Sequence, residues 1–295
     1  MTPLRDGAAA RASREARLAG RFDALHDARS RTTIAARLYA EAHGEEYPGQ
    51  VAASGSCDWT LLSLLVARLR LRPRQVLVDA GCGTGGVGLW LARALDSDLI
   101  GVDLSPVAVR EAVSRRAGFG LAPDRAAFRT ASLEATGLPS VHAHGIVCVD
   151  ALGFAADPAA ALHELARILA PGARLALTRS TRSGTGNAWA HEAAAAGLTL
   201  EHIDERPDEP AMWNRLYGLW IDHAAELRHE LGQEQAASML AEAGRRRPTL
   251  PGRRAVLLTL RRPPAPPGAG APTDTMTAQA PGADAGPESP KSNTQ

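Results

Sequence analysis

Short apolar runs alternate with amphipathic stretches through the middle of the chain. The apolar runs predict strands, and the stretches between them, in which apolar residues recur at helical spacing, predict helices. The predicted strands are residues 75–80, 98–103, 126–131, 144–149 and 173–178, and the predicted helices are 86–95, 105–117 and 157–170. Strands that alternate with helices are typical of a parallel sheet covered on both faces.

The pattern changes toward both ends of the chain. After the alternating units we predict a helix at 188–196, a strand at 198–204, helical periodicity over 212–243 and a last strand at 254–261. Residues 1–20 are predicted to be a flexible tail or a frayed helix, as chain ends usually are. Residues 263–295 are rich in Pro, Gly and Ala, cannot bury a core and are predicted to be disordered.

These boundaries predict one domain over residues 21–262. Its first part, 21–72, is predicted to be helical, with a helix-compatible composition over 21–47 and a strong helix over 59–71, and the alternating core follows over 73–262. The helical periodicity before the last strand makes residues 208–247 a helical insert in this core.

Composition narrows the classes of function. The chain has 295 residues and a formal net charge of +1 without a sustained basic stripe, so nucleic acid is not an expected partner. No apolar run approaches the ~20 residues of a membrane span. The odd set of Cys57, Cys82 and Cys148 lacks metal-type spacing, so we expect no metal site and a reducing compartment. Without a signal peptide's apolar core at the start of the chain, the expected location is the cytoplasm.

Candidate chemistry begins where the strand at 75–80 meets a run of glycines. Residues 81–86 read GCGTGG, a G-x-G-x-x-G pattern that on its own indicates a nucleotide cofactor. Glycines between a strand and a helix let the backbone approach a ligand and direct N–H groups toward it. Asp103 ends the next strand, about 20 residues downstream, where an acid accepts hydrogen bonds from a ribose diol. The carboxylate of Asp79 would repel a pyrophosphate and attract an amino or sulfonium group, which disfavours a dinucleotide.

Five segments then resemble the class I S-adenosylmethionine-dependent methyltransferases, in particular the bacterial small-molecule enzymes of the ubiquinone and menaquinone type. In chain order they are VDAGCGTGG at 78–86, GVDLSPVAVREA at 101–112, SLEATGLP at 132–139, VCVDAL at 147–152 and LHELARILAPGARLALT at 162–178. The resemblance implies a Rossmann-like, seven-stranded, mostly parallel α/β sheet with helices on both faces, an antiparallel last strand and an N-terminal helical lid.

The resemblance also implies S-adenosylmethionine as the cofactor and a set of residues around it. Asp79 would orient its amino group, Asp103 would bind the ribose hydroxyls, and Leu104 would lie against the adenine. Ser132 stands where the family often has an aspartate, and Leu133 would offer its backbone N–H. The full set of implied cofactor-binding residues is Asp79, Gly81, Cys82, Gly83, Gly85, Asp103, Leu104, Ser132, Leu133 and Asp150.

The sequence gives fewer indications of the residues that bind the methyl acceptor and catalyse the transfer. Asp150, at the carboxyl end of the fourth strand, is expected to face the sulfonium. Asp150 and His191 are the candidates for catalysis, with a turn acid and an ordinary surface histidine as the alternatives. The candidates for the substrate pocket are Tyr47, Trp213, Tyr217 and Trp220. The last three share one helical face, which either packs on the sheet or lines the acceptor pocket.

The function that the resemblance implies is methyl transfer to a small organic acceptor, most simply an O-methyltransferase of specialised metabolism. Transfer to carbon or nitrogen remains an alternative. So does a regulatory protein that binds the cofactor without catalysis. A dehydrogenase is disfavoured by Asp79. A sulfonium is already an activated leaving group, so no catalytic triad is required.

Overall fold

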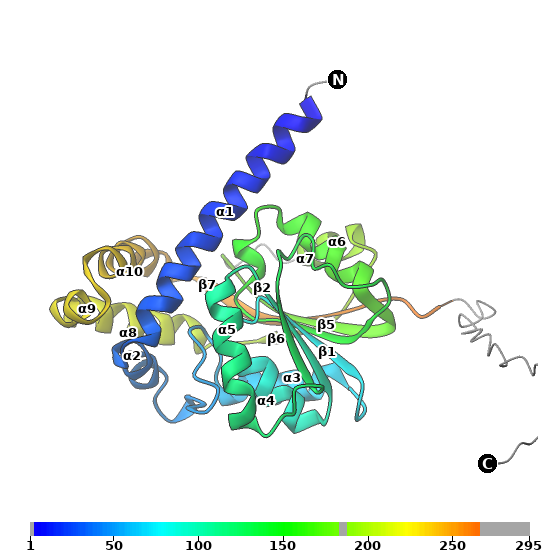
Figure 1. Ribbon diagram of the computed structural model, residues 1–295, viewed down its shortest axis with the longest axis horizontal. Coiled ribbons are helices and arrows are strands. Elements are labelled where there is room, and N and C mark those ends of the chain that lie inside the picture. The colour runs from blue at the N-terminus through cyan, green and yellow to red at the C-terminus, as the bar shows by residue number, and fades with distance from the viewer. Residues whose placement is uncertain (1–2, 183–187, 266–295) are drawn as a thin grey trace, which may run out of the picture. The chain divides into compact units, whose positions relative to one another are not determined.

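The computed structural model describes residues 3–182 and 188–265, and its centre is a seven-stranded sheet (Figure 1). Its order is β3-β2-β1-β4-β5-β7-β6, and β7 runs antiparallel to both neighbours. The strands are β1 (Val76–Ala80), β2 (Asp98–Asp103), β3 (Ala126–Thr130), β4 (Ala143–Cys148), β5 (Leu169–Arg182), β6 (Thr199–Glu205) and β7 (Arg253–Arg261). The predicted Rossmann-like sheet with an antiparallel last strand is confirmed.

Successive residues of the central strands enter different cores, because side chains alternate between the two faces of a sheet. Val78 and Ile146 belong to one hydrophobic cluster, whereas their neighbours Leu77 and Val147 belong to a second. The first cluster includes α6 (Pro158–Ile168) and α7 (Ala188–Ala195), and the second includes α3 (Trp59–Leu69) and α4 (Gly86–Leu95). Helix α5 (Pro106–Arg115) follows β2.

Local signals in the sequence explain where α6 begins and ends. Asp157 caps α6, since its Oδ1 accepts hydrogen bonds from the backbone N–H groups of Ala159 (3.1 Å) and Ala160 (3.0 Å). The helix ends at Ile168, earlier than predicted, and β5 already begins at Leu169. The register between β4 and β5 shifts in this stretch, so the Pro-Gly pair lies in an irregular start of the strand.

The N-terminal helices and the insert form a third hydrophobic cluster. It joins α1 (Pro3–Ser30) and α2 (Ile34–His43) to α8 (Glu209–Asp222), α9 (Ala224–Leu231) and α10 (Gln233–Arg246), which Figure 1 shows beside the sheet. Among its buried members are Leu38, Tyr39, Leu216, Tyr217, Trp220, Leu227 and Met239.

The structure gives the bounds of the helices in these regions. The stretch over residues 1–20, expected to be a flexible tail or a frayed helix, is helical from Pro3 on, and the later turns of α1 pack against α5 and α10. The helical periodicity over 212–243 corresponds to the three helices α8, α9 and α10. It is broken at His223 and again at Gly232, whose φ of +84° a helix cannot accommodate.

The predicted tail from 263 lies, from residue 266 on, outside the described residues. Within 3–182 and 188–265, no helix has the length and apolar character needed to cross a membrane. The same residues contain no group of three or more His, Cys, Asp and Glu side chains that could hold a metal ion.

Candidate functional site

The turn between β1 and α4 brings the backbone against neighbouring elements so closely that side chains are excluded. A Cβ on Gly81 would lie 2.2 Å from the Cβ of Ala151, and Gly81 has a φ of +77°. A Cβ on Gly86 would lie 1.9 Å from the backbone oxygen of Val51. Glycine is therefore required at both positions, and it lets the backbone of the turn pass close to its neighbours at the carboxyl edge of the sheet.

Asp103, the last residue of β2, is held by two backbone donors. Its Oδ2 accepts a hydrogen bond from the N–H of Gly83 and its Oδ1 one from the N–H of Ser105, each at 2.8 Å. Burial raises the pKa of this carboxyl group above its usual value. Because each carboxylate oxygen can accept more than one hydrogen bond, Asp103 retains the capacity to bind a pair of hydroxyl groups.

Asp79, on β1, is a buried carboxyl group with one hydrogen-bond donor among the residues that the structure describes. It is 2% exposed, and its Oδ2 accepts a hydrogen bond from the N–H of Gly88 at 2.9 Å. Burial raises its pKa to about 7, with a smaller contribution from the charge of Asp103. A carboxylate that loses this much hydration is stabilised by a nearby cation, which is the chemistry of an amino or sulfonium group.

One cavity of about 610 Å³ joins these groups to the helical insert. Most of the residues predicted from the sequence line it, namely Asp79, Gly81, Cys82, Gly83, Asp103, Leu104, Ser132, Leu133, Asp150, Trp213, Tyr217 and Trp220. The structure therefore brings the predicted cofactor residues and the aromatic face of α8 to one space, although they come from distant parts of the chain.

Three predicted site residues, Gly85, Tyr47 and His191, lie outside the lining of this cavity. A Cβ on Gly85 would point toward Ala112 and Phe128, and Gly85 is the N-cap residue of α4. Tyr47 packs against the third cluster. His191 is exposed on α7. None of these positions was distinguishable from a cavity position by sequence spacing alone.

Asp150 lines the cavity, but its carboxylate oxygens are engaged by protein donors. Oδ2 accepts from the N–H of Ser56 at 2.6 Å, and Oδ1 accepts from the hydroxyl groups of Ser56 (3.0 Å) and Thr178 (2.9 Å). The buried Arg206 completes this cluster with a hydrogen bond to the Ser56 hydroxyl at 2.8 Å and an ion pair with Asp58. Asp150 thus ties the loop before α3 to the sheet edge, which does not support the role in catalysis that the sequence suggested.

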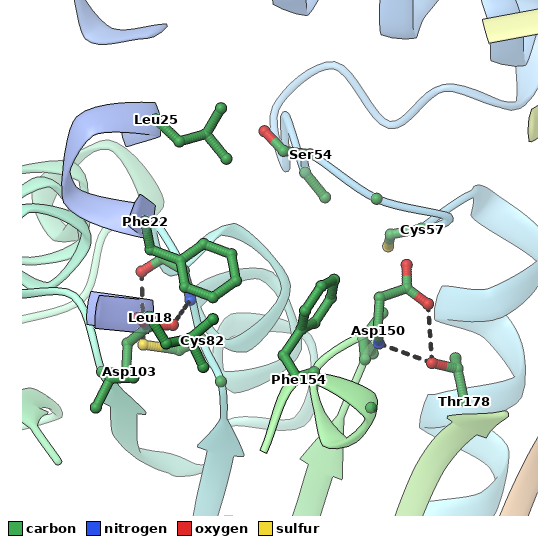
Figure 2. A pocket seen from close by; sticks show the side chains of 18 of the residues that line it. Leu18, Phe22, Leu25, Ser54, Cys57, Cys82, Asp103, Asp150, Phe154 and Thr178 are labelled. Atoms are coloured by element: carbon green, nitrogen blue, oxygen red, sulfur yellow. Dashed lines mark hydrogen bonds between the residues drawn. The ribbon is translucent and has the colours of Figure 1, made fainter. Parts of the chain in front are cut away.

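Helix α1 covers the cavity, as expected of the N-terminal helical lid that the resemblance implied, but it begins well before the predicted bound at residue 21. Figure 2 shows Leu18, Phe22 and Leu25 reaching from α1 over the site, and the rings of Phe22 and Phe154 meet edge to face at 5.5 Å. Asp23 fastens the helix to the start of α5, since its Oδ1 accepts hydrogen bonds from the Ser105 hydroxyl (2.5 Å) and the backbone N–H of Val107 (3.2 Å). The apolar residues Leu18, Phe22 and Leu25, spaced by three to four positions, were the available signal in the sequence.

Comparison with known proteins agrees with this geometry. Residues 77–172 match the family model described as a methyltransferase domain. Residues 77–172 of this chain are thus a methyltransferase domain, similar to those of the class I S-adenosylmethionine-dependent enzymes. The matched segment contains the glycine turn, Asp79, Asp103 and Asp150, so the family and the cavity identify the same edge of the sheet.

Relatives of the methyltransferase domain include an O-methyltransferase from Pyrenophora dematioidea, which is 27% identical over 151 residues, or 51% of this chain and 49% of that protein. The chain thus spans about half the length of that relative. A ubiquinone biosynthesis O-methyltransferase from Xanthomonas euvesicatoria pv. vesicatoria is 29% identical over 183 residues, covering 59% of this chain and 74% of the relative.

Solved structures share the fold at low sequence identity. A methyltransferase from Geobacter sulfurreducens in complex with S-adenosylhomocysteine has a TM-score of 0.57 at 21% identity, over 76% of this chain and 97% of that one. The [4+2]-cyclase SpnF has a TM-score of 0.62 at 22% identity, over 70% and 81% of the two chains. Since one of these proteins is a cyclase, the fold does not by itself specify the reaction.

The raised pKa of Asp79 predicts that binding of S-adenosylmethionine depends on pH. Only the ionised carboxylate attracts the cofactor's cationic groups, so the affinity should fall by up to about tenfold for each pH unit below about 7. Calorimetric titrations between about pH 5.5 and 7.5 measure this dependence. Asp79→Asn, which keeps the shape and lacks the ionisation, should bind weakly with little change over the same range.

Stability without ligand should have the opposite pH dependence. The folded protein holds the Asp79 proton more tightly than the unfolded chain, so this group's contribution to stability is present below about pH 4 and is lost as the pH rises to about 7.

For the affinity measurements, a steep pH dependence of S-adenosylmethionine binding that persists in Asp79→Asn would contradict the assignment of Asp79 as the titrating group.

Proposed function

We propose that this protein transfers a methyl group from S-adenosylmethionine to an oxygen atom of a small organic acceptor. The observation that carries the proposal is the continuity of the cavity, which runs from Asp79 and Asp103 to the aromatic residues of α8. Relatives named O-methyltransferase favour oxygen as the accepting atom. Other relatives and structural neighbours are named N- or C-methyltransferases, so the labelling experiment described below also identifies the atom that is methylated.

The residues present fit this cofactor. Asp103 would hold the ribose hydroxyls, and the carboxylate of Asp79 would attract the amino group of the methionine part. Leu104 and Leu133 line the cavity as apolar surfaces for the adenine, and Ser132 adds a hydroxyl group beside them. S-adenosylmethionine, when bound, supplies a methyl group that is already activated by its sulfonium.

The chain's own contribution to the reaction would be positioning and exclusion of water. The edge-to-face pair of Phe22 and Phe154 places apolar rings across the cavity between its Asp103 and Asp150 sides (Figure 2). An apolar cover of this kind keeps water from the methyl group, and holding the acceptor in line with that group supplies most of the required rate enhancement.

A small-molecule acceptor is favoured over nucleic acid by the charge of the chain and of the cavity. The formal net charge is +1, and the cavity lining contains Arg29, Arg246 and Arg253 together with Asp150, Glu209 and Glu242. This mixture lacks the uniformly basic surface that a nucleic acid requires.

Incubation with methyl-labelled S-adenosylmethionine tests the proposal. The acceptors would be matched sets of phenols, catechols and hydroxy acids, each with its amine counterpart, and Asp103→Ala would be the control. Label should enter at least one hydroxyl compound with the unchanged protein, and at a cofactor concentration below saturation the variant should transfer at least about tenfold less. Cofactor binding without transfer to any compound would instead favour a binding protein or another reaction on this fold.

A further inference from the structure

Three carboxyl groups line the part of the cavity that faces the helical insert, and they differ in what their oxygens contact. Both oxygens of Asp150 accept hydrogen bonds from protein donors. Glu242 accepts a hydrogen bond from the hydroxyl group of Tyr217 at 3.3 Å and forms an ion pair with Arg246 at 3.4 Å. Glu209, the first residue of α8, is the third.

Glu209 has one oxygen held and one available. Its Oε1 accepts a hydrogen bond from the indole N–H of Trp213 at 2.7 Å. Within residues 3–182 and 188–265, its Oε2 has no hydrogen-bond donor and the carboxylate forms no ion pair. Because Trp213 lies one turn further along the same helix, it holds the carboxyl group in one orientation.

The location of Glu209 is the edge of the sheet where methyl transfer is proposed. Thr178 and Ser180 of β5, Arg253 of β7 and Asp150 after β4 line the same cavity. Burial raises the pKa of Glu209, and the charge of Asp150 raises it further, while Arg206, Trp213 and Arg253 oppose this shift. A half-buried carboxyl group in this setting is stabilised by a hydrogen-bond donor from a ligand.

Aromatic rings stand beside this carboxyl group. The rings of Trp213 and Tyr217 are stacked, with centroids 5.5 Å apart and an interplanar angle of 29°, and both residues line the cavity. The half-buried indole of Trp213, with the buried ring of Tyr217 stacked behind it, is a flat apolar wall next to a carboxylate oxygen that lacks a protein donor. Such a wall fits a flat molecule that carries a proton donor at its edge.

We propose that Glu209 is the specificity-determining residue of the acceptor site and that its Oε2 accepts a hydrogen bond from the hydroxyl or amino group of an aromatic acceptor. This inference rests on the proposed function. It assigns the acceptor class as aromatic compounds with a proton on the atom to be methylated, and it makes the O-methylated product, which lacks that proton, a poorer ligand.

Two matched probes test this directly, 2-naphthol and 2-methoxynaphthalene. Equilibrium dialysis against the full chain saturated with S-adenosylhomocysteine measures the affinity for each. The unchanged protein should bind 2-naphthol about tenfold more tightly, as expected for one hydrogen bond to a charged group. In Glu209→Gln the amide oxygen still accepts from Trp213 and the amide NH₂ faces the cavity, so the preference for 2-naphthol should disappear.

Two further variants make every outcome informative. Glu205→Gln, which changes an exposed carboxylate at the end of β6 paired with Arg254, should keep the preference. Trp213→Phe keeps an aromatic ring but releases Glu209 Oε1, so the preference should fall here too, which covers the case that Glu209→Gln does not fold. Equal affinities for the two probes, a preference that survives Glu209→Gln, or no binding of either probe would overturn the inference. If the unchanged protein does not bind S-adenosylhomocysteine, the proposed function itself is overturned.

Discussion

Asp103→Ala is expected to lower the affinity for S-adenosylmethionine at least tenfold while the fold survives. The carboxylate is placed at the end of β2 with spare acceptor capacity on both oxygens, and each hydrogen bond from a ribose hydroxyl to a charged acceptor contributes roughly 1.5–3 kcal/mol. Some of the loss would come from the turn, because Gly83 and Ser105 lose the acceptor for their N–H groups. Isothermal titration calorimetry measures the change.

Two control variants separate the ribose contact from the turn. Asp103→Asn keeps an acceptor oxygen for one of the two N–H groups of Gly83 and Ser105 but lacks the charge, so it should lose part of the affinity. Asp98→Ala removes a carboxylate from the other end of the same strand, where it pairs with Arg125, and should leave the affinity unchanged. An Asp103→Ala protein that binds S-adenosylmethionine as tightly as the unchanged one would show that the ribose assignment is wrong.

Tyr217→Ala is expected to destabilise the fold strongly. Tyr217 is 2% exposed, and its ring meets that of Trp220 at 5.3 Å and stacks on that of Trp213. Removing a buried aromatic ring from such a cluster costs about 3–5 kcal/mol, because the neighbours do not close the cavity. The thermal midpoint should fall by roughly 10 °C, as measured by the loss of circular dichroism on heating.

Tyr217→Phe provides the matched control. It keeps the ring and removes only the hydroxyl group that donates to Glu242 at 3.3 Å, so the loss should stay within about 1.5 kcal/mol. A Tyr217→Ala protein with an unchanged thermal midpoint and normal cofactor affinity would mean that the ring is a wall of the acceptor pocket and contributes nothing to the core.

The sheet and the cofactor end of the site could be predicted because their signals are local. The strand into Asp79, the glycine turn and Asp103 lie within one stretch of about 30 residues that must fold as a strand-turn-helix-strand unit. The glycine pattern around position 81 is also visible in the local sequence. The atom that makes glycine necessary there, the Cβ of Ala151, belongs to a distant segment and is seen only in the structure.

The other end of the site could not be predicted because its contacts join distant segments. Asp150 binds Ser56 across 94 positions, and Arg206 reaches Ser56 across 150, so no spacing rule relates them. The sequence placed the start of the helical lid at residue 21, because the Ala- and Arg-rich composition of residues 1–20 hides the apolar positions of α1. Its attachment by Asp23 to the start of α5 becomes visible only once the helix is docked.

Calorimetric titration of the full chain with S-adenosylmethionine, and separately with NADH, tests the central claim most directly. The carboxylates of Asp79 and Asp103 at the glycine turn predict one S-adenosylmethionine per chain and no binding of NADH, whose pyrophosphate Asp79 would repel. Binding of NADH without binding of S-adenosylmethionine would contradict the account, as would the absence of binding by either compound.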